Sequence, residues 1–264
     1  MPLFDNPRPL GAGAIAFVFQ GGGSLTVPQV GTLWALTEAG VAPDLVVGSS
    51  AGALNAVAFA SDPSPDGLDH LEAVWVSLRR RRVAPFSLRA LLAAPAGRGD
   101  AFVSDTASQV LLERAALART LRETCVVGGR LLVDGGVSAD VPVLQAEALG
   151  ANVTYVLPAA TWDVAQPSPH RPLPQAYHAL RQLLDAAARR DVAAAQRQVH
   201  VLPAPTTRIV NPIDFRDMAQ LIDKGYRLAA EWFAINATQT HAPATGRPVT
   251  RPLDDARRRR RPRS

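Results

Sequence analysis

Three glycine-containing motifs carry residues that could perform acyl transfer, and the first holds the candidate nucleophile. Gly48-Ser49-Ser50-Ala51-Gly52 is a GxSxG motif between a short apolar segment and a run of small residues. This is the context of a nucleophile elbow, a tight turn that presents a serine where a strand ends and a helix begins. The partial positive charge of a helix N-terminus favours the negative charge that develops there during acyl transfer. The motif predicts Ser50 as a nucleophile. Gly48 and Gly52 flank it because the turn is tight and neighbouring chain must pass close by.

The second motif is Gly21-Gly22-Gly23, which follows another apolar segment. If the two preceding strands are parallel neighbours, both turns open at the same edge of the sheet. The N–H groups of Gly21, Gly22 and Gly23 could then stabilise an oxyanion close to Ser50. The pattern lacks the third glycine of a dinucleotide-binding loop, and the absence of a following GK[ST] excludes a P-loop. A plain flexible turn is the alternative.

The third motif is Asp134-Gly135-Gly136, directly after the predicted strand 130–133. An aspartate at a strand end can orient and deprotonate a serine without an intervening histidine. Taken alone, the motif is most simply an Asp-Gly turn. Its occurrence together with the other two motifs predicts Asp134 as a general base.

The elements that must position these motifs alternate between strand and helix. Four apolar segments are predicted to be strands: 14–19, 44–47, 152–157 and 199–202. The first two are each followed by residues of helical spacing or small size, which is typical of a parallel α/β sheet. Gly128-Gly129 lies between 125–127 and 130–133 and predicts a hairpin. The expected fold is α/β, with a mainly parallel central sheet and helices on both faces.

Three longer helices are predicted from periodicity and from terminal residues. The first spans 66–82, with acidic residues at its start and Arg79 to Arg82 at its end, as the helix macrodipole favours. The second spans 175–196 and has these residues on one face: Ala176, Leu180, Leu183 and Ala187. The last begins with Asn211 as cap and Pro212 in its first turn. Its apolar stripe consists of Phe215, Met218, Ile222, Tyr226, Ala229 and Phe233.

Length and composition predict a single globular domain. The chain has 264 residues, of which 47% are hydrophobic and 19% charged, which excludes collagen, a disulfide scaffold and wholesale disorder. The formal net charge is +5, but residues 257–264 contain six arginines, and without them the net charge would be −1. The basic character therefore belongs to a tail. We expect a flexible lead-in at 1–13, a folded domain at 14–238 and a disordered basic tail at 239–264.

Cysteine and hydropathy patterns bear on compartment and cofactors. Cys125 is the only cysteine, so an internal disulfide is impossible, and no Cys/His cluster has zinc spacing. The apolar run at 14–19 is too short for a signal peptide core or a membrane span. We expect no metal and a location in a reducing compartment, the cytoplasm.

The order GGG … GxSxG … DGG resembles the patatin-like phospholipase family, bacterial type. The resemblance is carried by 17–23, 43–55 and 131–137 and extends over about residues 14–235. It implies a patatin-like fold and hydrolysis of fatty-acyl esters of lipids through a Ser–Asp dyad and an acyl-enzyme. Ser50 would be the nucleophile and Asp134 the general base. The oxyanion hole would consist of Gly21, Gly22 and Gly23.

The resemblance also bears on cofactors and partners. It implies no metal and no organic cofactor, and a lipid or fatty-acyl ester as the substrate. The arginines of 257–263 could contact an anionic membrane, bind nucleic acid non-specifically or have no role, and no role is the favoured interpretation. No specific nucleic acid is expected as a partner, and nothing in the sequence indicates an oligomeric state.

The chain departs from the family pattern in three places. Leu25 and Thr26 stand where the family usually has Arg or Lys followed by Gly, and Asp140 stands where it often has Asn. Only 84 positions separate Ser50 from Asp134. This interval is shorter than the family's by about a βαβ unit, roughly 30 residues. The interval predicts an internal deletion between the two members of the dyad.

Two alternatives to the dyad remain open. One is a Ser-His-Asp triad, for which the histidines after the serine are His70, His170, His178, His200 and His241. The elbow of such hydrolases normally follows several strands, whereas one strand precedes this elbow. The other alternative is a catalytically impaired relative that binds lipid or acts as a scaffold, as the internal deletion would produce.

Overall fold

The protein is described by a computed structural model over residues 11–78, 126–127, 130–131, 139–162, 172–205 and 215–236. The expected α/β fold is confirmed. A four-stranded sheet has the order β2-β1-β5-β6, and each neighbouring pair is parallel. Its strands are β1 (Ile15–Phe19), β2 (Leu45–Gly48), β5 (Val153–Leu157) and β6 (Gln198–Val201). Each of the four predicted strands is observed to within a residue or two of its predicted bounds.

The central strands are apolar because both faces of the sheet are covered. All five residues of β5 and all but the first of β1 are buried, whereas β2 and β6 at the edges are partly exposed. Buried parallel strands have this continuous apolar character because helices pack on both sides. The short runs Ala-Phe-Val-Phe and Val-Thr-Tyr-Val-Leu therefore form the two middle strands.

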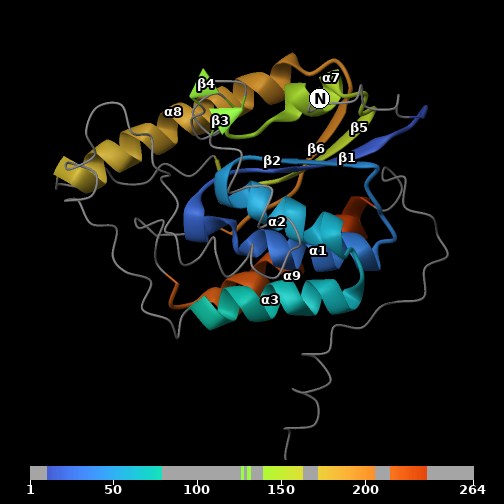
Figure 1. Cartoon of the computed structure of the whole chain (residues 1–264), viewed down its shortest axis with the longest axis horizontal. Coiled ribbons are helices and arrows are strands. Elements are labelled where there is room, and N and C mark those ends of the chain that lie inside the picture. The colour runs from blue at the N-terminus through green and yellow to red at the C-terminus, as the bar shows by residue number, and fades with distance from the viewer. Residues whose placement is uncertain are drawn as a thin grey trace, which may run out of the picture.

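Helices cover the two faces of the sheet unequally (Figure 1). One face carries α1 (Pro28–Glu38), α2 (Ser50–Ser61), α3 (Pro65–Leu78) and α9 (Met218–Asn236). The other carries α7 (Val143–Ala148) and α8 (Pro172–Ala194). A short 3-10 helix, η1 (Gly23–Thr26), leads from the glycine run into α1.

Alternating side chains of β1 supply both hydrophobic cores. Phe17 and Phe19 belong to the larger core beneath α1, α2, α3 and α9. Ala16 and Val18 belong to the smaller core beneath α7 and α8. Successive residues of a strand point to opposite faces, so one strand packs large rings against the helix-rich face and small residues against the other.

The predicted hairpin is also confirmed. β3 (Val126–Val127) pairs with β4 (Arg130–Leu131) in antiparallel register. The predicted helix at 66–82 is described from Pro65 to Leu78, and Arg79 to Arg82 lie outside the described residues. Residues 1–10 and 237–264 also lie outside them, so the predicted tail and most of the lead-in stay predictions.

Two expectations about helices were wrong in detail. The last helix begins at Met218, since Phe215 has no regular secondary structure and a turn occupies 216–217; Asn211 and Pro212 lie outside the described residues. The buried stripe of α9 nonetheless agrees well with the prediction: Met218, Leu221, Ile222, Gly225, Ala229 and Phe233. In α8, Leu180 and Leu183 are 50% and 69% exposed, so the predicted apolar face is not the packed one.

Candidate functional site

Strand register brings the glycine run and the GxSxG motif to one edge of the sheet. β1 and β2 are parallel neighbours in which Phe19 is paired with Gly48. Their carboxyl ends therefore lie side by side, and the two turns that follow them are adjacent. Ser49 N–H donates a hydrogen bond to the Phe19 carbonyl at 3.1 Å, which ties the start of one turn to the other. The expected juxtaposition of these two motifs is thus observed.

Ser50 has the backbone conformation of an elbow residue. Its φ is +49°, and it is the only described residue other than glycine with a positive φ. Ser49 before it is extended, with φ −117° and ψ 139°, and α2 begins at Ser50. A non-glycine residue in the left-handed region costs energy and persists where the surrounding structure holds it. The strain therefore marks Ser50 as a residue of special geometry at a helix N-terminus.

The two glycines of the elbow are required by close backbone contacts. A Cβ on Gly52 would lie 2.4 Å from the Gln20 carbonyl oxygen and 2.8 Å from that of Phe19. A Cβ on Gly48 would lie 2.7 Å from the Cα of Ala53. In both cases the obstacle is backbone, which cannot move aside as a flexible side chain would. The glycines thus allow α2 to pack directly on the ends of β1 and β2.

Gly21 lies directly beside the candidate nucleophile. The position of a Gly21 Cβ would be 3.3 Å from the Cβ of Ser50 and 2.5 Å from Oδ1 of Asp140. A side chain at this position would force the Asp140 carboxylate to shift. The glycine turn, Ser50 and Asp140 therefore meet at one place, although they are far apart in the sequence.

The three glycine N–H groups of the turn differ in their hydrogen bonding. Gly21 N–H donates to the backbone carbonyl of Asp140 at 3.2 Å. Among the described residues, no acceptor faces the N–H of Gly22 or Gly23. Both of these glycines have positive φ, +147° and +61°. Within the described part of the chain, two amides of the turn therefore make no backbone hydrogen bond, and the third is occupied.

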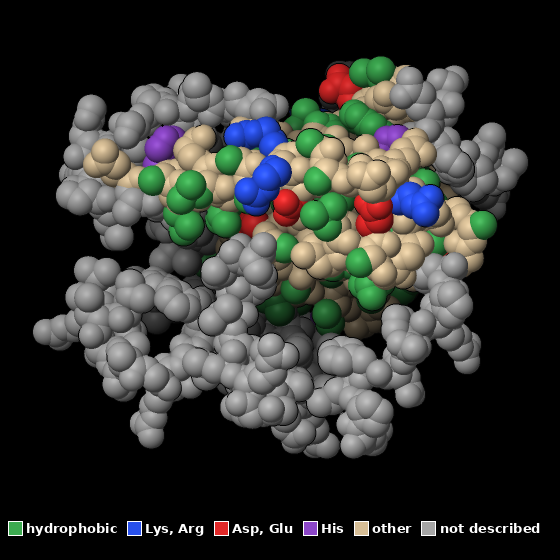
Figure 2. Space-filling view, turned by 90° about the horizontal axis from the view of Figure 1, so that it is seen from above, with side chains coloured by type: hydrophobic (Ala, Val, Ile, Leu, Met, Phe, Trp, Pro, Cys, Tyr) green, Lys and Arg blue, Asp and Glu red, His purple; other side chains and the backbone are tan. Residues whose placement is uncertain are grey.

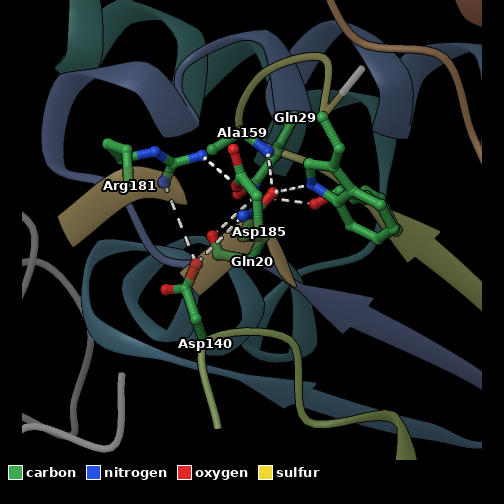
Figure 3. A network of polar contacts seen from close by, with 8 residues as sticks. Gln20, Gln29, Asp140, Ala159, Arg181 and Asp185 are labelled. Carbon is green, nitrogen blue, oxygen red and sulfur yellow. Dashed lines mark hydrogen bonds and ion pairs between the residues drawn. The ribbon is translucent and has the colours of Figure 1, made fainter. Parts of the chain in front are cut away.

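Gln20 joins the glycine turn to two other parts of the chain. Its side chain is fully buried. Nε2 donates to Oδ2 of Asp140 at 2.9 Å, and Oε1 accepts from the backbone N–H of Ala159 and from Nε1 of Trp162, both at 3.0 Å. Figure 3 shows Gln20 at the centre of this cluster. The residue before the glycines is thus fixed by the loops that follow β5 and precede α7.

Arg181 of α8 connects two buried carboxylates. Its Nη2 donates to Oδ1 of Asp185 at 2.8 Å, and its Nη1 lies 3.8 Å from Oδ2 of Asp140 (Figure 3). Burial raises the pKa of the Asp185 carboxyl, the Arg181 charge opposes that rise, and the nearby Asp140 adds to it. Two acids and one guanidinium are therefore held together on the α8 side of the glycine turn.

A second polar network supports the turn from the opposite face. Gln29 of α1 donates from Nε2 to the carbonyls of Gln20 and Leu157, at 2.9 and 2.8 Å. Asn55 of α2 donates to the Oε1 of Gln29 at 2.9 Å and accepts from Nε1 of Trp75 at 2.8 Å. Buried amides are stable only when they are hydrogen-bonded in this way. The glycine turn is consequently supported by polar contacts on the α8 side of the sheet and on the α1 and α2 side.

The third motif of the sequence lies outside the described residues. The structure does not describe 132–138, which contains Asp134, Gly135 and Gly136. It also does not describe 79–125, the interval in which the deletion is predicted. The role of Asp134 and the deletion both stay predictions.

The histidines proposed for a triad are partly described. His170 and His241 lie outside the described residues. His70 is in α3, His178 is in α8, and the ring of His200 stacks on Tyr155 at a centroid distance of 4.9 Å. No hydrogen bond links Ser50 to a histidine within the described part of the chain.

Four residues of the site were not expected to have a role there: Gln20, Asp140, Arg181 and Asp185. Asp140 was noted only because the resembled family often has Asn at this position. The sequence does contain one local signal, since Arg181 and Asp185 are four residues apart and face each other on a helix. Nothing local in the sequence connects them with Gln20.

The face over α7 and α8 has mixed chemistry. Figure 2 views the molecule from this side, where basic, acidic and hydrophobic side chains are interspersed. None of the helices within the described ranges could cross a membrane, since none combines the needed length and apolarity. In the same ranges, no three His, Cys, Asp or Glu side chains gather into a group that could hold a metal ion.

Comparison with known proteins finds one family. Residues 17–126 match the family model described as patatin-like phospholipase. The match includes the glycine run and the GxSxG motif, and it ends before Asp134. A search of curated proteins finds no match. Over residues 17–126 the chain is therefore similar to the patatin-like phospholipases, and its α/β fold with a parallel four-stranded sheet is consistent with theirs.

Proposed function

We propose that this protein is a serine acyl hydrolase that cleaves fatty-acyl esters of lipids, with Ser50 as the nucleophile and Asp134 as the general base. The observation that carries the proposal is the geometry of Ser50. It has a left-handed backbone at the start of α2, and its Cβ is 3.3 Å from the Cβ position of Gly21 in the glycine turn. The similarity of residues 17–126 to patatin-like phospholipases supports lipid esters as the substrate class.

In the first half of the proposed reaction, Oγ of Ser50 attacks the ester carbonyl carbon, and the Asp134 carboxylate accepts the hydroxyl proton. The carbonyl oxygen becomes an oxyanion. The N–H groups of Gly22 and Gly23 would donate hydrogen bonds to this oxyanion. The third expected donor, the Gly21 N–H, is bonded to the Asp140 carbonyl in this structure. Donors of this kind stabilise charge that exists only in the transition state and the tetrahedral intermediate.

The second half of the reaction releases the fatty acid. The tetrahedral intermediate collapses, the C–O bond to the alcohol breaks, and the proton held by Asp134 passes to the leaving alkoxide. Water then attacks the acyl-enzyme while Asp134 accepts a proton from it, and that proton returns to Oγ of Ser50 as the carboxylic acid leaves. The scheme needs one nucleophile, one base and the glycine turn.

The site of action proposed is the cytoplasm, with peripheral contact between the enzyme and an anionic membrane. The lone Cys125 is compatible with a reducing compartment. The contact is assigned to the arginines of 257–263, which lie outside the described residues. Unchanged binding to anionic vesicles after deletion of 256–264 would remove this role.

Hydrolysis of acyl esters by matched variants tests the proposed chemistry. Ser50→Ala and Asp134→Asn should each abolish release of fatty acid from phospholipid vesicles and of nitrophenol from a nitrophenyl ester. Substitutions of His70, His170, His178, His200 and His241 should leave activity intact. Loss of activity in one histidine variant, with Asp134→Asn still active, would replace the dyad by a triad.

A catalytically impaired, lipid-binding relative is the second candidate, and the interval of 84 positions between Ser50 and Asp134 favours it. An internal deletion that removes a strand could displace Asp134 by one strand spacing, about 4.8 Å, which a dyad does not tolerate. This candidate predicts that the protein binds vesicles but does not hydrolyse their lipids, and that Ser50→Ala binds vesicles as wild type does.

A further inference from the structure

Asp140 lies at the junction of the glycine turn and the nucleophile elbow. Its backbone carbonyl accepts the Gly21 N–H at 3.2 Å. Its Oδ1 is 2.5 Å from the Cβ position of Gly21, and the Cβ of Ser50 is 3.3 Å from the same point. Oδ1 of Asp140 and Cβ of Ser50 therefore both lie against Gly21 and are close to each other.

The Asp140 carboxylate is buried, and Gln20 and Arg181 are among its partners. Only 5% of its side chain is exposed. Gln20 donates to its Oδ2 at 2.9 Å, and the Arg181 guanidinium lies 3.8 Å from the same oxygen. A buried carboxylate is strongly disfavoured unless hydrogen bonds and an opposite charge accompany it. Both requirements are met here, by residues from β1's carboxyl end and from α8.

Arg181 also borders the glycine turn itself. Its Nη1 is 3.8 Å from the Cβ position of Gly22, and its side chain is 12% exposed. Its bond to Asp185, at 2.8 Å, fixes the direction of the guanidinium along α8. The guanidinium therefore lies beside both the Asp140 carboxylate and Gly22.

This arrangement has an electrostatic consequence for acyl transfer. A carboxylate so close to Ser50 would oppose the negative charge that develops on the substrate oxygen, because Coulomb repulsion is weakly screened in a buried site. A guanidinium next to the same carboxylate offsets this repulsion. Because the guanidinium is shared with Asp185, it offsets the Asp140 charge in part while it holds the cluster together.

We propose that Asp140 and Arg181 are positioning residues for acylation of Ser50, an inference that rests on the proposed hydrolase function. Asp140 docks the glycine turn onto the elbow through its carbonyl and its carboxylate. Arg181 offsets the charge of that carboxylate beside Gly22. Both residues would act through the glycine turn and not on the reacting atoms.

The kinetic test is a double-mutant cycle of Asp140 and Arg181. The quantity measured is the second-order rate constant for labelling of Ser50 by a fluorophosphonate. The proteins are wild type, Arg181→Met, Asp140→Asn and the double variant, with Arg181→Lys for rescue. Arg190→Met is the matched control, since Arg190 is on the same helix and its side chain is 77% exposed.

Arg181→Met should label about 10- to 100-fold more slowly, the range in which a misplaced catalytic group reduces rates. Arg181→Lys should recover part of this loss, and the control should label at the wild-type rate. The double variant should label faster than Arg181→Met, because removing the carboxylate removes the uncompensated charge. A merely structural role predicts no such recovery. Wild-type labelling of Arg181→Met, or a double variant slower than both single ones, would overturn the proposal.

Amide hydrogen exchange separates this proposal from the hydrolase function. Peptides covering 20–26 should exchange faster in Asp140→Ala than in wild type, while peptides of α9 exchange equally in both. If wild type does not label but this local increase is seen, the docking role stands and the hydrolase function fails. Equal exchange of 20–26 in both proteins would overturn the docking role, whatever the labelling result.

Discussion

The Cβ of Ser50 lies 3.3 Å from the position that a Cβ of Gly21 would occupy, although 29 positions separate these residues in the chain. The contact follows from the parallel pairing of β1 and β2, in which Phe19 is opposite Gly48. Each strand is followed at once by a tight turn. Two short sequence motifs therefore become one site through the register of two neighbouring strands.

Gly52→Ala should destabilise the protein by about 2 kcal/mol or more, because its Cβ would stand 2.4 Å from the Gln20 carbonyl oxygen. The gain in helix propensity, about 1 kcal/mol, is too small to compensate. Urea unfolding monitored by circular dichroism measures the change. Gly11→Ala is the matched control: nothing lies within 4 Å of its Cβ position, so its effect should stay within about 0.5 kcal/mol. Equal stability of the two variants would contradict the close contact of α2 with β1.

Asn55→Ala should cost about 3 kcal/mol of unfolding free energy, since each buried group left without its partner costs about 1–3 kcal/mol. Asn55 is fully buried and bonded to the Thr26 carbonyl, Gln29 and Trp75. Asn236→Ala is the control, since Asn236 at the end of α9 makes a single bond to a carbonyl of its own helix. Its loss should be about 0.5 kcal/mol. A small effect of Asn55→Ala would mean that the hydrogen-bond network of Gln29, Asn55 and Trp75 does not support the glycine turn.

Asp185→Asn should become more stable relative to wild type as the pH rises. Burial raises the pKa of the Asp185 carboxyl above 3.8, against the opposing charge of Arg181. The folded protein therefore holds this proton more tightly than the unfolded chain does. The stability that this provides is complete below the unfolded-state pKa and is lost as the pH rises through the folded-state pKa. Asparagine carries no such proton, so the difference in Tm between variant and wild type should grow in favour of the variant above about pH 4. A difference that is constant with pH would contradict the raised pKa.

Tyr155→Phe should leave the stability unchanged or raise it by up to about 1 kcal/mol. Tyr155 is fully buried, and its hydroxyl has no hydrogen-bond partner among the described residues. Tyr226→Phe provides the contrast, because that hydroxyl donates to Oε2 of Glu38 at 2.7 Å. Its removal should cost about 1–2 kcal/mol. Chemical denaturation of both variants decides the matter, and a larger loss in Tyr155→Phe would show that its hydroxyl is bonded after all.

The sheet and the adjacency of two motifs could be predicted from the sequence because the signals are local. Strands buried on both faces are continuous apolar runs, as in Ile15–Phe19 and Val153–Leu157. The GxSxG elbow needs its glycines within two residues of Ser50, so its spacing is visible without a structure. The antiparallel pair at Val126–Val127 and Arg130–Leu131 follows from the glycines between them in the same way.

The polar cluster around Asp140 could not be predicted, because its contacts are distant in the chain. Gln20 and Asp140 are 120 positions apart, and no periodicity connects them. In α8 the apolar pattern was misleading. Leu180 and Leu183 face solvent, whereas Asp185 is buried and bonded to Arg181. Hydrophobic periodicity assigns charged residues to the exposed side of a helix, so it fails where the buried side carries an ion pair.

Covalent labelling of Ser50 by a fluorophosphonate tests the central claim most directly, with Ser49→Ala as the matched control. Ser49 is the neighbouring serine, and its side chain makes no cap hydrogen bond to α2, so its loss should not disturb the elbow. Intact mass and peptide mapping should show one adduct on Ser50 in wild type and in Ser49→Ala, and none in Ser50→Ala. Equal labelling of wild type and Ser50→Ala, or an adduct mapped to another residue, would contradict the assignment of Ser50 as the nucleophile.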